Sequence, residues 1–337
     1  MTVDKKTIIA LDAMGGDYAP AETVKGAVSA VNSDYNVIVN LFGDEEKICK
    51  ELANYTYDNN RVIITHSGSV IETSEQPVKA IKSKRDSSLV MGLYAVKNGE
   101  ADGLVSCGNT GALLVGGQTI IGRLPDIERA ALAFTVPSMT VPVMIIDCGA
   151  NADARPEMLL NFARMASVYR KNIDGVENPR VGIVNIGEEE EKGNVLVKET
   201  FPLLRECESI NFVGSVEARG LAEGSVDVAV CDAFVGNIIL KTYEGVSSFL
   251  LRQLKGVLLS SPKTKLGALL INKDLKATLK KFSHEEYGGA PMLGLKAPVF
   301  KTHGTSKSVE IKNSILQCKA YIEAGVTGKI ADSITNG

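Results

Sequence analysis

Several apolar runs in the sequence end in short loops rich in glycine, asparagine, aspartate and threonine. The run 102–106 leads into Gly108, Asn109, Thr110 and Gly111, which precede an apolar stretch of helical character. Comparable loops follow the runs 7–12, 142–147, 180–186 and 226–231. Glycine lets backbone N–H groups approach an anion, and Asn or Thr can cap the helix that follows. Loops of this composition, with few cations, predict a cleft that binds a small anion such as phosphate through amides and hydroxyls.

Two of these loops add further donors. The run 142–147 is followed within a few residues by Asn151. The run 180–186 is followed by the glutamates at 188–191 and then by Lys192 and Asn194. The glutamates are interpreted as a solvated first helical turn that complements the helix dipole. Lys192 and Asn194 are the ligand candidates here, because they offer one cation and one amide donor next to a glycine.

The patterns of several common catalytic sites are missing. The loop at 108–111 lacks the spacing and the lysine of a P-loop, and no strand leads into a GxGxxG dinucleotide fingerprint. Neither an HExxH zinc motif nor a GxSxG nucleophile elbow is present. Cys107 is either a thiolate nucleophile at a helix start or a small buried residue, and the second is favoured because free cysteine is commonly buried. These observations predict neither a metal site nor a cofactor.

The composition is that of a globular protein with a large core. The chain has 337 residues, of which 45% are hydrophobic and 23% are charged. A formal charge of -3 argues against a general nucleic-acid binder, which needs a broad basic surface. Six cysteines without CxxC spacing suit a reducing compartment and imply neither disulfides nor a zinc site. With no apolar signal core and no run of about 18 apolar residues, we expect a cytosolic protein that at most rests on a membrane.

Val- and Ile-rich runs alternate with helix-like stretches along the chain. The predicted strands are 7–12, 36–42, 61–65, 102–106, 130–136, 142–147, 180–186, 210–213, 226–231 and 298–301. The predicted helices are 20–32, 44–54, 76–97, 110–122, 156–170, 192–208 and 305–324. This alternation predicts one three-layer α/β/α sandwich over residues 1–337, with a mostly parallel sheet and an antiparallel hairpin formed by 130–136 and 142–147. We expect the polar loops to meet in one crevice at one edge of the sheet.

The stretch 246–282 interrupts the alternation of strands and helices, because its apolar spacing predicts two amphipathic helices joined near residues 260–262. Between Arg252 and Lys281 there are eight basic residues and one acid, a balance of +7. The stretch is either a helical hairpin packed on the sheet or on a dimer mate, or a tip that binds an anionic membrane, and the two roles can coexist. The expected membrane contacts are Leu258, Leu259, Lys263, Lys265, Leu266, Leu269 and Leu270.

Taken in order, these loops resemble those of the PlsX-type phosphate acyltransferases. The motifs are DAMGGD at 12–17, GNTGA at 108–112, DCGAN at 147–151, NIGEE with KGN at 185–194, and YGGAP at 287–291. The resemblance implies a sandwich related to phosphotransacetylases and isopropylmalate-type dehydrogenases. It also implies a homodimer whose projecting helical hairpin touches the inner face of the cell membrane.

The same resemblance implies a reaction. Long-chain acyl-acyl carrier protein and inorganic phosphate would give acyl phosphate and free carrier protein. The acyl phosphate would feed a membrane-bound glycerol-3-phosphate acyltransferase at the start of phospholipid synthesis.

The sequence departs from the family pattern at a few positions. Cys107 stands where the family usually has alanine, Ser215 where asparagine is common, and Ala233 where glycine is common. Residues 302–306 are a variant of a Gly-His-Gly-Ser-like turn. These changes weaken any fixed role for Ser215 or Ala233 and leave the family resemblance intact.

Phosphate is itself a competent nucleophile toward a thioester, so the site must hold a dianion against a carbonyl and stabilise the oxyanion. Lys192 is expected to screen charge, Asn151 or Asn194 to donate to the oxyanion, and Asp12 to orient one of the donors. The expected phosphate ligands are Asn109, Thr110, the Gly111 amide, Ser306 and His303.

Three alternatives stay open. A short-chain phosphotransacylase would use coenzyme A thioesters on the same broad fold. An isopropylmalate-type NAD-dependent dehydrogenase would need clustered acidic metal ligands and substrate arginines. Asp227 and Asp232 lie in one strand region, but their five-residue spacing does not form a convincing cluster. A non-enzymatic membrane scaffold would use the hairpin alone and leave the amide-rich loops unexplained.

Overall fold

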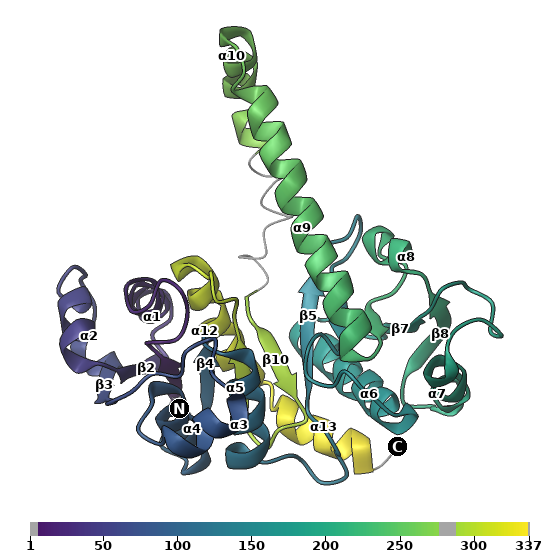
Figure 1. Cartoon of the computed structure of the whole chain (residues 1–337), viewed down its shortest axis with the longest axis horizontal. Helices are drawn as coiled ribbons and strands as arrows, with labels where there is room; N and C mark the ends of the chain where they lie inside the picture. Colours follow the sequence, from purple (N-terminus) through teal and green to yellow (C-terminus); the bar gives the residue numbers. More distant parts are fainter. Residues whose placement is uncertain (1–5, 276–287, 336–337) are drawn as a thin grey trace, which may run out of the picture.

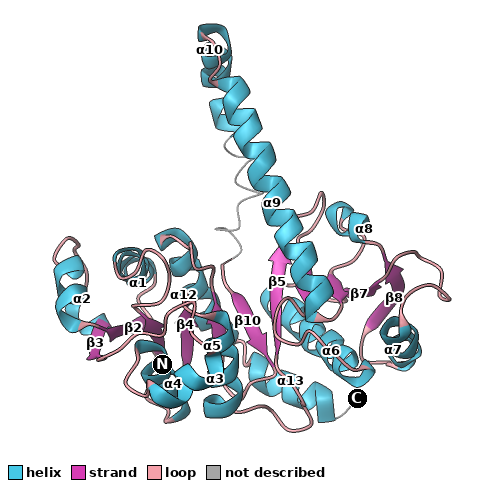
Figure 2. Ribbon diagram, in the orientation of Figure 1, coloured by secondary structure: helices cyan, strands magenta, loops and turns pink. Residues whose placement is uncertain are grey.

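The structure is a computed structural model that describes residues 6–275 and 288–335. Its strands form one open sheet in the order β3-β2-β1-β4-β11-β10-β5-β6-β9-β7-β8, with helices on both faces (Figure 1). Most neighbouring strands are parallel (Figure 2). The predicted three-layer α/β/α sandwich is thereby confirmed.

The first part of the chain builds the half of the sheet from β3 to β4. Its strands are β1 (Thr7–Asp12), β2 (Val37–Gly43), β3 (Val62–His66) and β4 (Gly103–Ser106). Its helices are α1 (Ala21–Ser33), α2 (Glu45–Leu52), α3 (Pro77–Ser83), α4 (Ser88–Lys97) and α5 (Thr110–Gly116). The predicted single helix over 76–97 is two helices, because Ser87 accepts a backbone N–H from Val90 and starts α4 as a new helix.

The rest of the chain builds the other half and then returns to the centre. The strands are β5 (Ala131–Val136), β6 (Val143–Ile146), β7 (Arg180–Val184), β8 (Asn211–Val216), β9 (Val228–Val230), β10 (Ala290–Leu293) and β11 (Val299–Lys301). The helices are α6 (Pro156–Ile173), α7 (Val195–Glu206), α8 (Ala218–Glu223), α9 (Ala233–Leu258), α10 (Pro262–Leu270), α12 (Ser308–Glu323) and α13 (Val326–Thr335). β5 and β6 form the predicted antiparallel hairpin, whereas β10 was not predicted.

Alternate strand residues pack into hydrophobic clusters on the two faces of the sheet. Ile9 and Leu11 of β1 belong to the cluster that includes α1, α6 and α12, whereas Ala10 belongs to the cluster with α4 and α5. Ile145 of β6 joins a third cluster with Leu240 of α9. The period of two along each strand therefore buries both faces, as expected for a sheet between two helix layers.

Three antiparallel pairs at the centre reverse the strand direction between the two halves of the sheet. β10 pairs antiparallel with β11 and with β5, and β5 pairs antiparallel with β6. β1 to β4 and β11 therefore point one way, and β6 to β9 point the other. The carboxyl ends of the two halves lie at opposite edges, so the expectation that all polar loops share one edge is wrong.

Helix α9 begins well before the predicted hairpin and then projects from the sheet. Asp232 caps it by accepting the Val235 N–H at 2.9 Å. At Gly236 it packs so closely on the loop after β6 that a Cβ would lie 1.9 Å from the Asp147 carbonyl oxygen. Figure 1 shows α9 extending away from the sheet to α10 at its tip. Residues 276–282 of the predicted hairpin lie outside the described residues. Within the described residues, no helix is long and apolar enough to cross a bilayer.

Candidate functional site

A cleft of about 340 Å³ opens near the centre of the sheet, where its two halves meet. It collects residues from the loops after β4, β6 and β11, from β5 and from one side of α9. Of the residues predicted to bind phosphate, Thr110 and His303 line it. The full lining is Thr110, Leu132, Phe134, Cys148, Gly149, Asn237, Leu240, Lys241, Lys301, Thr302, His303 and Gly304.

Lys301, at the end of β11, brings a buried positive charge to this cleft. Lys301 is only 5% exposed, and its ammonium donates to the carbonyl oxygens of Cys107 (3.2 Å) and Thr302. Burial lowers the pKa of Lys301, while the nearby Cys107, Glu310 and Asp12 act to raise it. An ammonium has three donors, so one remains beyond these two carbonyls for an anion in the cleft.

Cys107, whose carbonyl oxygen accepts from this lysine, is itself buried. It is 2% exposed, and its sulfur accepts a hydrogen bond from the Thr302 hydroxyl at 2.7 Å. Burial raises the pKa of Cys107 to about 12, although Thr302 and Lys301 act to lower it. A thiol with this pKa is not ionised at neutral pH, so the structure favours the small buried residue over the thiolate nucleophile.

Glu244 links two further basic groups at the cleft. One carboxylate oxygen accepts from Lys241 Nζ at 2.8 Å, and the other lies 3.6 Å from His303 Nε2. The His303 ring also packs against Phe134, with 5.4 Å between the ring centroids. These contacts position a lysine from α9 and a histidine from the β11–α12 loop so that both can donate to an anion.

Asp12 does not line the cleft, but its carboxylate holds the segments that carry the cleft loops. Its carboxylate accepts from the hydroxyls of Ser88 (2.6 Å) and Ser106 (2.7 Å), and the Ser106 oxygen accepts from the Gly108 N–H at 3.0 Å. Burial raises the pKa of Asp12, while the two serine hydroxyls act to lower it. Asp12 therefore ties β1, α4 and β4 together and positions the loop that carries Thr110.

Asn109 and Gly111 hold the same loop in place around Thr110. The Asn109 amide oxygen accepts a backbone N–H in the first turn of α5 at 2.9 Å. Its amide nitrogen donates to three carbonyl oxygens of the segment 72–75 at 3.0 to 3.2 Å. A Cβ on Gly111 would lie 2.4 Å from Pro77 Cγ, so glycine lets α3 and α5 approach this closely. The Asn109 side chain is therefore an anchor of the loop.

Ser306 follows His303 in the loop that leads to α12. It is 4% exposed, and its backbone N–H donates to the His303 carbonyl at 3.1 Å. Within the described part of the chain its buried hydroxyl has no hydrogen-bond partner. Leaving a buried hydroxyl unsatisfied is costly, so this oxygen is a candidate ligand-binding group.

Asn151 is engaged in the turn after β6. Its amide nitrogen donates to the Ala130 carbonyl (2.9 Å) and to the Asp147 carboxylate (2.6 Å). The fully buried Asp147 also accepts four backbone N–H groups. Burial raises the pKa of Asp147, while these donors act to lower it. The network fixes Gly149 in the wall of the cleft.

Lys192 and Asn194 lie beyond β7 and do not line the cleft. Lys192 forms a surface ion pair with Glu189 at 2.7 Å. Asn194 caps α7 by accepting the Val197 N–H at 2.9 Å, and it lines a separate groove between α7 and α9. β9 lies between β6 and β7 in the sheet, so the loop after β7 is farther from the sheet centre than the loop after β6, which reaches the cleft.

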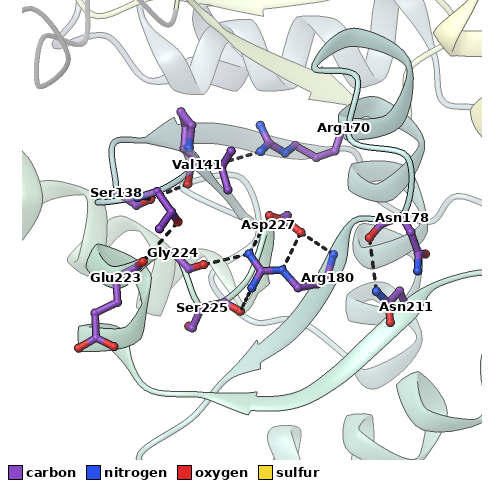
Figure 3. Close-up of polar contacts among 12 residues, drawn as sticks. Ser138, Val141, Arg170, Asn178, Arg180, Asn211, Glu223, Gly224, Ser225 and Asp227 are labelled. Carbon is purple, nitrogen blue, oxygen red and sulfur yellow. Dashed lines mark hydrogen bonds and ion pairs between the residues drawn. The ribbon is translucent and has the colours of Figure 1, made fainter.

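Asp227 and Asp232, the acidic pair weighed for the dehydrogenase alternative, lie at opposite ends of β9. Figure 3 shows Asp227 bound to Arg180, whose guanidinium donates to the two carboxylate oxygens at 3.0 and 3.1 Å. Asp232, after the strand, caps α9. Across residues 6–275 and 288–335, no group of three or more His, Cys, Asp and Glu side chains is placed to hold a metal ion.

Three polar residues of the cleft, Asn237, Lys241 and Lys301, are absent from the sequence predictions. The two lysines come from α9 and β11, outside the polar loops that the sequence analysis describes as poor in cations. A signal for Lys301 existed, because a lysine that ends a buried strand needs a partner for its charge. Asn237 and Lys241 are four residues apart and so share one side of a helix. That this side faces the cleft is visible only in the tertiary structure.

The chain matches the family model described as "Fatty acid synthesis protein" over residues 7–329. It is 45% identical to a phosphate acyltransferase of Clostridium perfringens, over 97% of this chain and 96% of that protein. It is 44% identical to the phosphate acyltransferase of Clostridium acetobutylicum, over 96% of this chain and 98% of that protein. The chain belongs to the PlsX-type phosphate acyltransferase family. The family resemblance is confirmed, and members of this family are acyltransferase enzymes.

Solved structures of other proteins share the fold of this phosphate acyltransferase family member. A phosphotransacetylase from Streptococcus pyogenes has a TM-score of 0.62 at 18% identity, and the EutD phosphotransacetylase from Staphylococcus aureus has 0.58 at 17%, each over 94% of both chains. A 4-hydroxythreonine-4-phosphate dehydrogenase from Klebsiella pneumoniae has 0.51 at 13%, over 96% of this chain and 99% of that chain. At these identities the likeness shows the fold alone.

The contacts of Asn109 predict different effects for two matched substitutions at helix caps. Asn109→Asp keeps an oxygen to cap α5 but replaces the donor that faces three carbonyl oxygens, so we expect the free energy of unfolding to fall by about 1–3 kcal/mol. Asn194→Asp keeps the cap of α7 and places a carboxylate at a helix start, so stability should stay the same or rise by up to about 1 kcal/mol. Denaturant unfolding measures both, and equal losses would contradict the anchoring role of Asn109.

Proposed function

We propose that this protein transfers a long-chain fatty acyl group from acyl-acyl carrier protein to inorganic phosphate and so produces an acyl phosphate. The observation that carries the proposal is the cleft lined by Thr110, Lys241, Lys301 and His303. Two lysines, one histidine and one hydroxyl around a small space suit a phosphate ion. The name of the relatives, phosphate acyltransferase, supports phosphate as the acyl acceptor.

In the proposed reaction a phosphate oxygen attacks the carbonyl carbon of the thioester. A new C–O bond forms, the C–S bond breaks, and the carrier thiolate leaves. Lys241 and Lys301 offset the charge of the phosphate, while Thr110 and His303 donate hydrogen bonds that orient it. The unsatisfied hydroxyl of Ser306 is a further donor. Phosphate is itself the nucleophile, so the step needs no covalent intermediate with the protein.

We assign oxyanion stabilisation to Asn237, whose side chain belongs to the cleft lining on α9. The amide nitrogen of Asn151 already donates to a carbonyl and a carboxylate, so Asn151 acts by positioning Gly149. Asp12 and Asn109 act in the same indirect way on the loop of Thr110. Lys192 and Asn194, on the far side of α9, are proposed to contact the acyl donor outside the phosphate cleft.

We further propose that the hairpin of α9 and α10 supports dimerisation and binds the inner face of the cell membrane. Leu266, Leu269 and Leu270 are 61%, 70% and 79% exposed, and α10 contains no buried residue in this single chain. Leu259, Lys263 and Lys265 are also exposed, whereas Leu258 is half-buried. Apolar side chains interleaved with lysines favour an anionic membrane surface. The acyl phosphate would pass to a membrane-bound glycerol-3-phosphate acyltransferase for phospholipid synthesis.

The proposed reaction is tested directly with purified protein, palmitoyl-acyl carrier protein and inorganic phosphate. Hydroxylamine traps acyl phosphate, so we expect a palmitoyl hydroxamate that requires both substrates. The comparison donors are acetyl- and butyryl-coenzyme A. Turnover of these donors without turnover of palmitoyl-acyl carrier protein would favour the short-chain phosphotransacylase, and the absence of acyl phosphate with every donor would overturn the proposal.

Lys301→Met tests whether the buried ammonium holds phosphate. Losing a charge-assisted hydrogen bond should lower kcat/KM for phosphate about 10- to 100-fold. Because burial lowers the pKa of Lys301, the charged form disappears as pH rises through a value below that of an ordinary lysine. The wild type should therefore lose phosphate affinity on the alkaline side, and the variant should lack this dependence. The exposed Lys296→Met is the matched control, and an identical pH profile in wild type and Lys301→Met would refute the role.

The double substitution Leu269→Glu and Leu270→Glu tests membrane binding. Both side chains are more than two-thirds exposed at the tip, and two carboxylates there would repel an anionic bilayer. In flotation with vesicles that contain anionic lipid, we expect the wild type to float and the double variant to stay with the soluble fraction. Met139→Glu, at an 84% exposed position on the β5–β6 turn, should float like the wild type. Failure of the wild type to float would end the membrane proposal.

A further inference from the structure

An apolar groove of about 560 Å³ lies at the foot of α9, on the side away from the phosphate cleft. Its walls come from the end of β7, the start of α7 and the first turns of α9. Apolar side chains predominate among them, including Ile183, Leu196, Val235, Ile238 and Ile239. The volume falls within the range of about 300–1,000 Å³ that is usual for small-molecule sites.

The polar side chains of this groove are engaged in local structure. Asp232 caps α9 by accepting from Val235, and Asn194 caps α7. Asn185 donates to the carbonyl of Lys192 and to the hydroxyl of Ser215. The groove therefore presents mainly hydrocarbon to a ligand. At its rim Ile186 is 78% exposed and Ile238 is 51% exposed, an arrangement typical of a site that an apolar ligand covers.

We propose that this groove binds the fatty acyl chain of the substrate, an inference that rests on the proposed acyl transfer. Only the first turns of α9 separate it from the cleft: Asn237 and Lys241 face the cleft, whereas Val235, Ile238 and Ile239 line the groove. A helix is about 10 Å across with its side chains. A long acyl chain with its carbonyl in the cleft can extend past the foot of α9 into the groove, and a chain of two to four carbons is too short to fill it.

The route between the two sites passes the loop after β6. Gly149 of this loop lines the cleft, and the Ala233 N–H at the start of α9 donates to the Asn151 carbonyl at 2.9 Å. A Cβ built on Gly149 would meet no atom within 4 Å, so the surface there is open. In the proposed path the acyl chain runs over Gly149, near the start of α9.

Beyond the groove, the apolar side of α9 stays exposed along the helix. Val246, Phe249, Leu250, Leu254 and Val257 follow Ile239 at helical spacing and are exposed. Figure 2 shows the same helix running on to α10 at the tip. This continuity gives an acyl phosphate an apolar surface between the groove and the hairpin.

Ile238→Asn, at a half-exposed position, tests the groove without removing a core residue. We expect kcat/KM for palmitoyl-acyl carrier protein to fall at least tenfold and that for butyryl-acyl carrier protein to change less than twofold. Val309→Asn is the matched control, because Val309 is a helical, 47% exposed aliphatic residue on α12, outside the groove. Both variants should be tested without vesicles. Equal losses for the two donors would overturn the assignment of the groove.

A second measurement does not depend on turnover. Palmitic acid with a diazirine on its terminal carbon is bound to the wild-type protein, irradiated and mapped by mass spectrometry. We expect adducts in 183–197 or 235–239, competed by unlabelled palmitic acid. Adducts confined to 246–275 or elsewhere would refute the groove. If no donor yields acyl phosphate but the groove is labelled, the proposed function fails while apolar binding at the groove stands.

Discussion

The buried ammonium of Lys301 is the constraint on which the cleft depends. A charge this far from water is tolerated only with partners close by, and here two backbone carbonyls supply part of that need. The carboxylates of Asp12 and Glu310 act to raise the pKa of Lys301, and Lys301 lines the cleft. An anion bound there would complete the solvation that burial removed. Burial also raises the pKa of the Cys107 thiol and of the Cys148 thiol in the cleft wall, so the cleft presents donors and cations in place of a thiolate nucleophile.

Helix α9 connects three parts of the molecule that the sheet alone would leave separate. Gly236 allows the helix to rest against the Asp147 carbonyl, and this contact sets the height and rotation of the first turns. That rotation directs Asn237 and Lys241 toward the cleft and Ile238 and Ile239 toward the groove. Farther along, the same helix leaves the sheet and exposes an apolar side that ends at α10. One helix thereby relates the candidate cleft, the apolar groove and the tip at α10.

Much of the fold could be predicted from the sequence, because strands with apolar residues on both faces and helices with one apolar side leave few arrangements. The runs at 7–12, 36–42 and 142–147 correspond closely to β1, β2 and β6. β10 was missed because it has only four residues and contains Pro291, which weakens any strand pattern. The break between α3 and α4 was also missed, since Ser87 acts as a cap only in the observed local geometry.

The candidate site was predicted only in part. Asn109 and Asn151 have the residue types of ligand donors, but their amides are used to anchor loops, which no local pattern distinguishes. What the sequence alone determined is the layered α/β architecture, the family, the glycine- and amide-rich composition of the loop at Thr110 and the basic, apolar character of the stretch after α9 begins. Which loops share a cleft was decided by three antiparallel pairings between strands distant along the chain. Local periodicity reports which residues are buried, whereas strand direction depends on long-range hydrogen bonds, so only the tertiary structure could bring Lys241, Lys301 and His303 together.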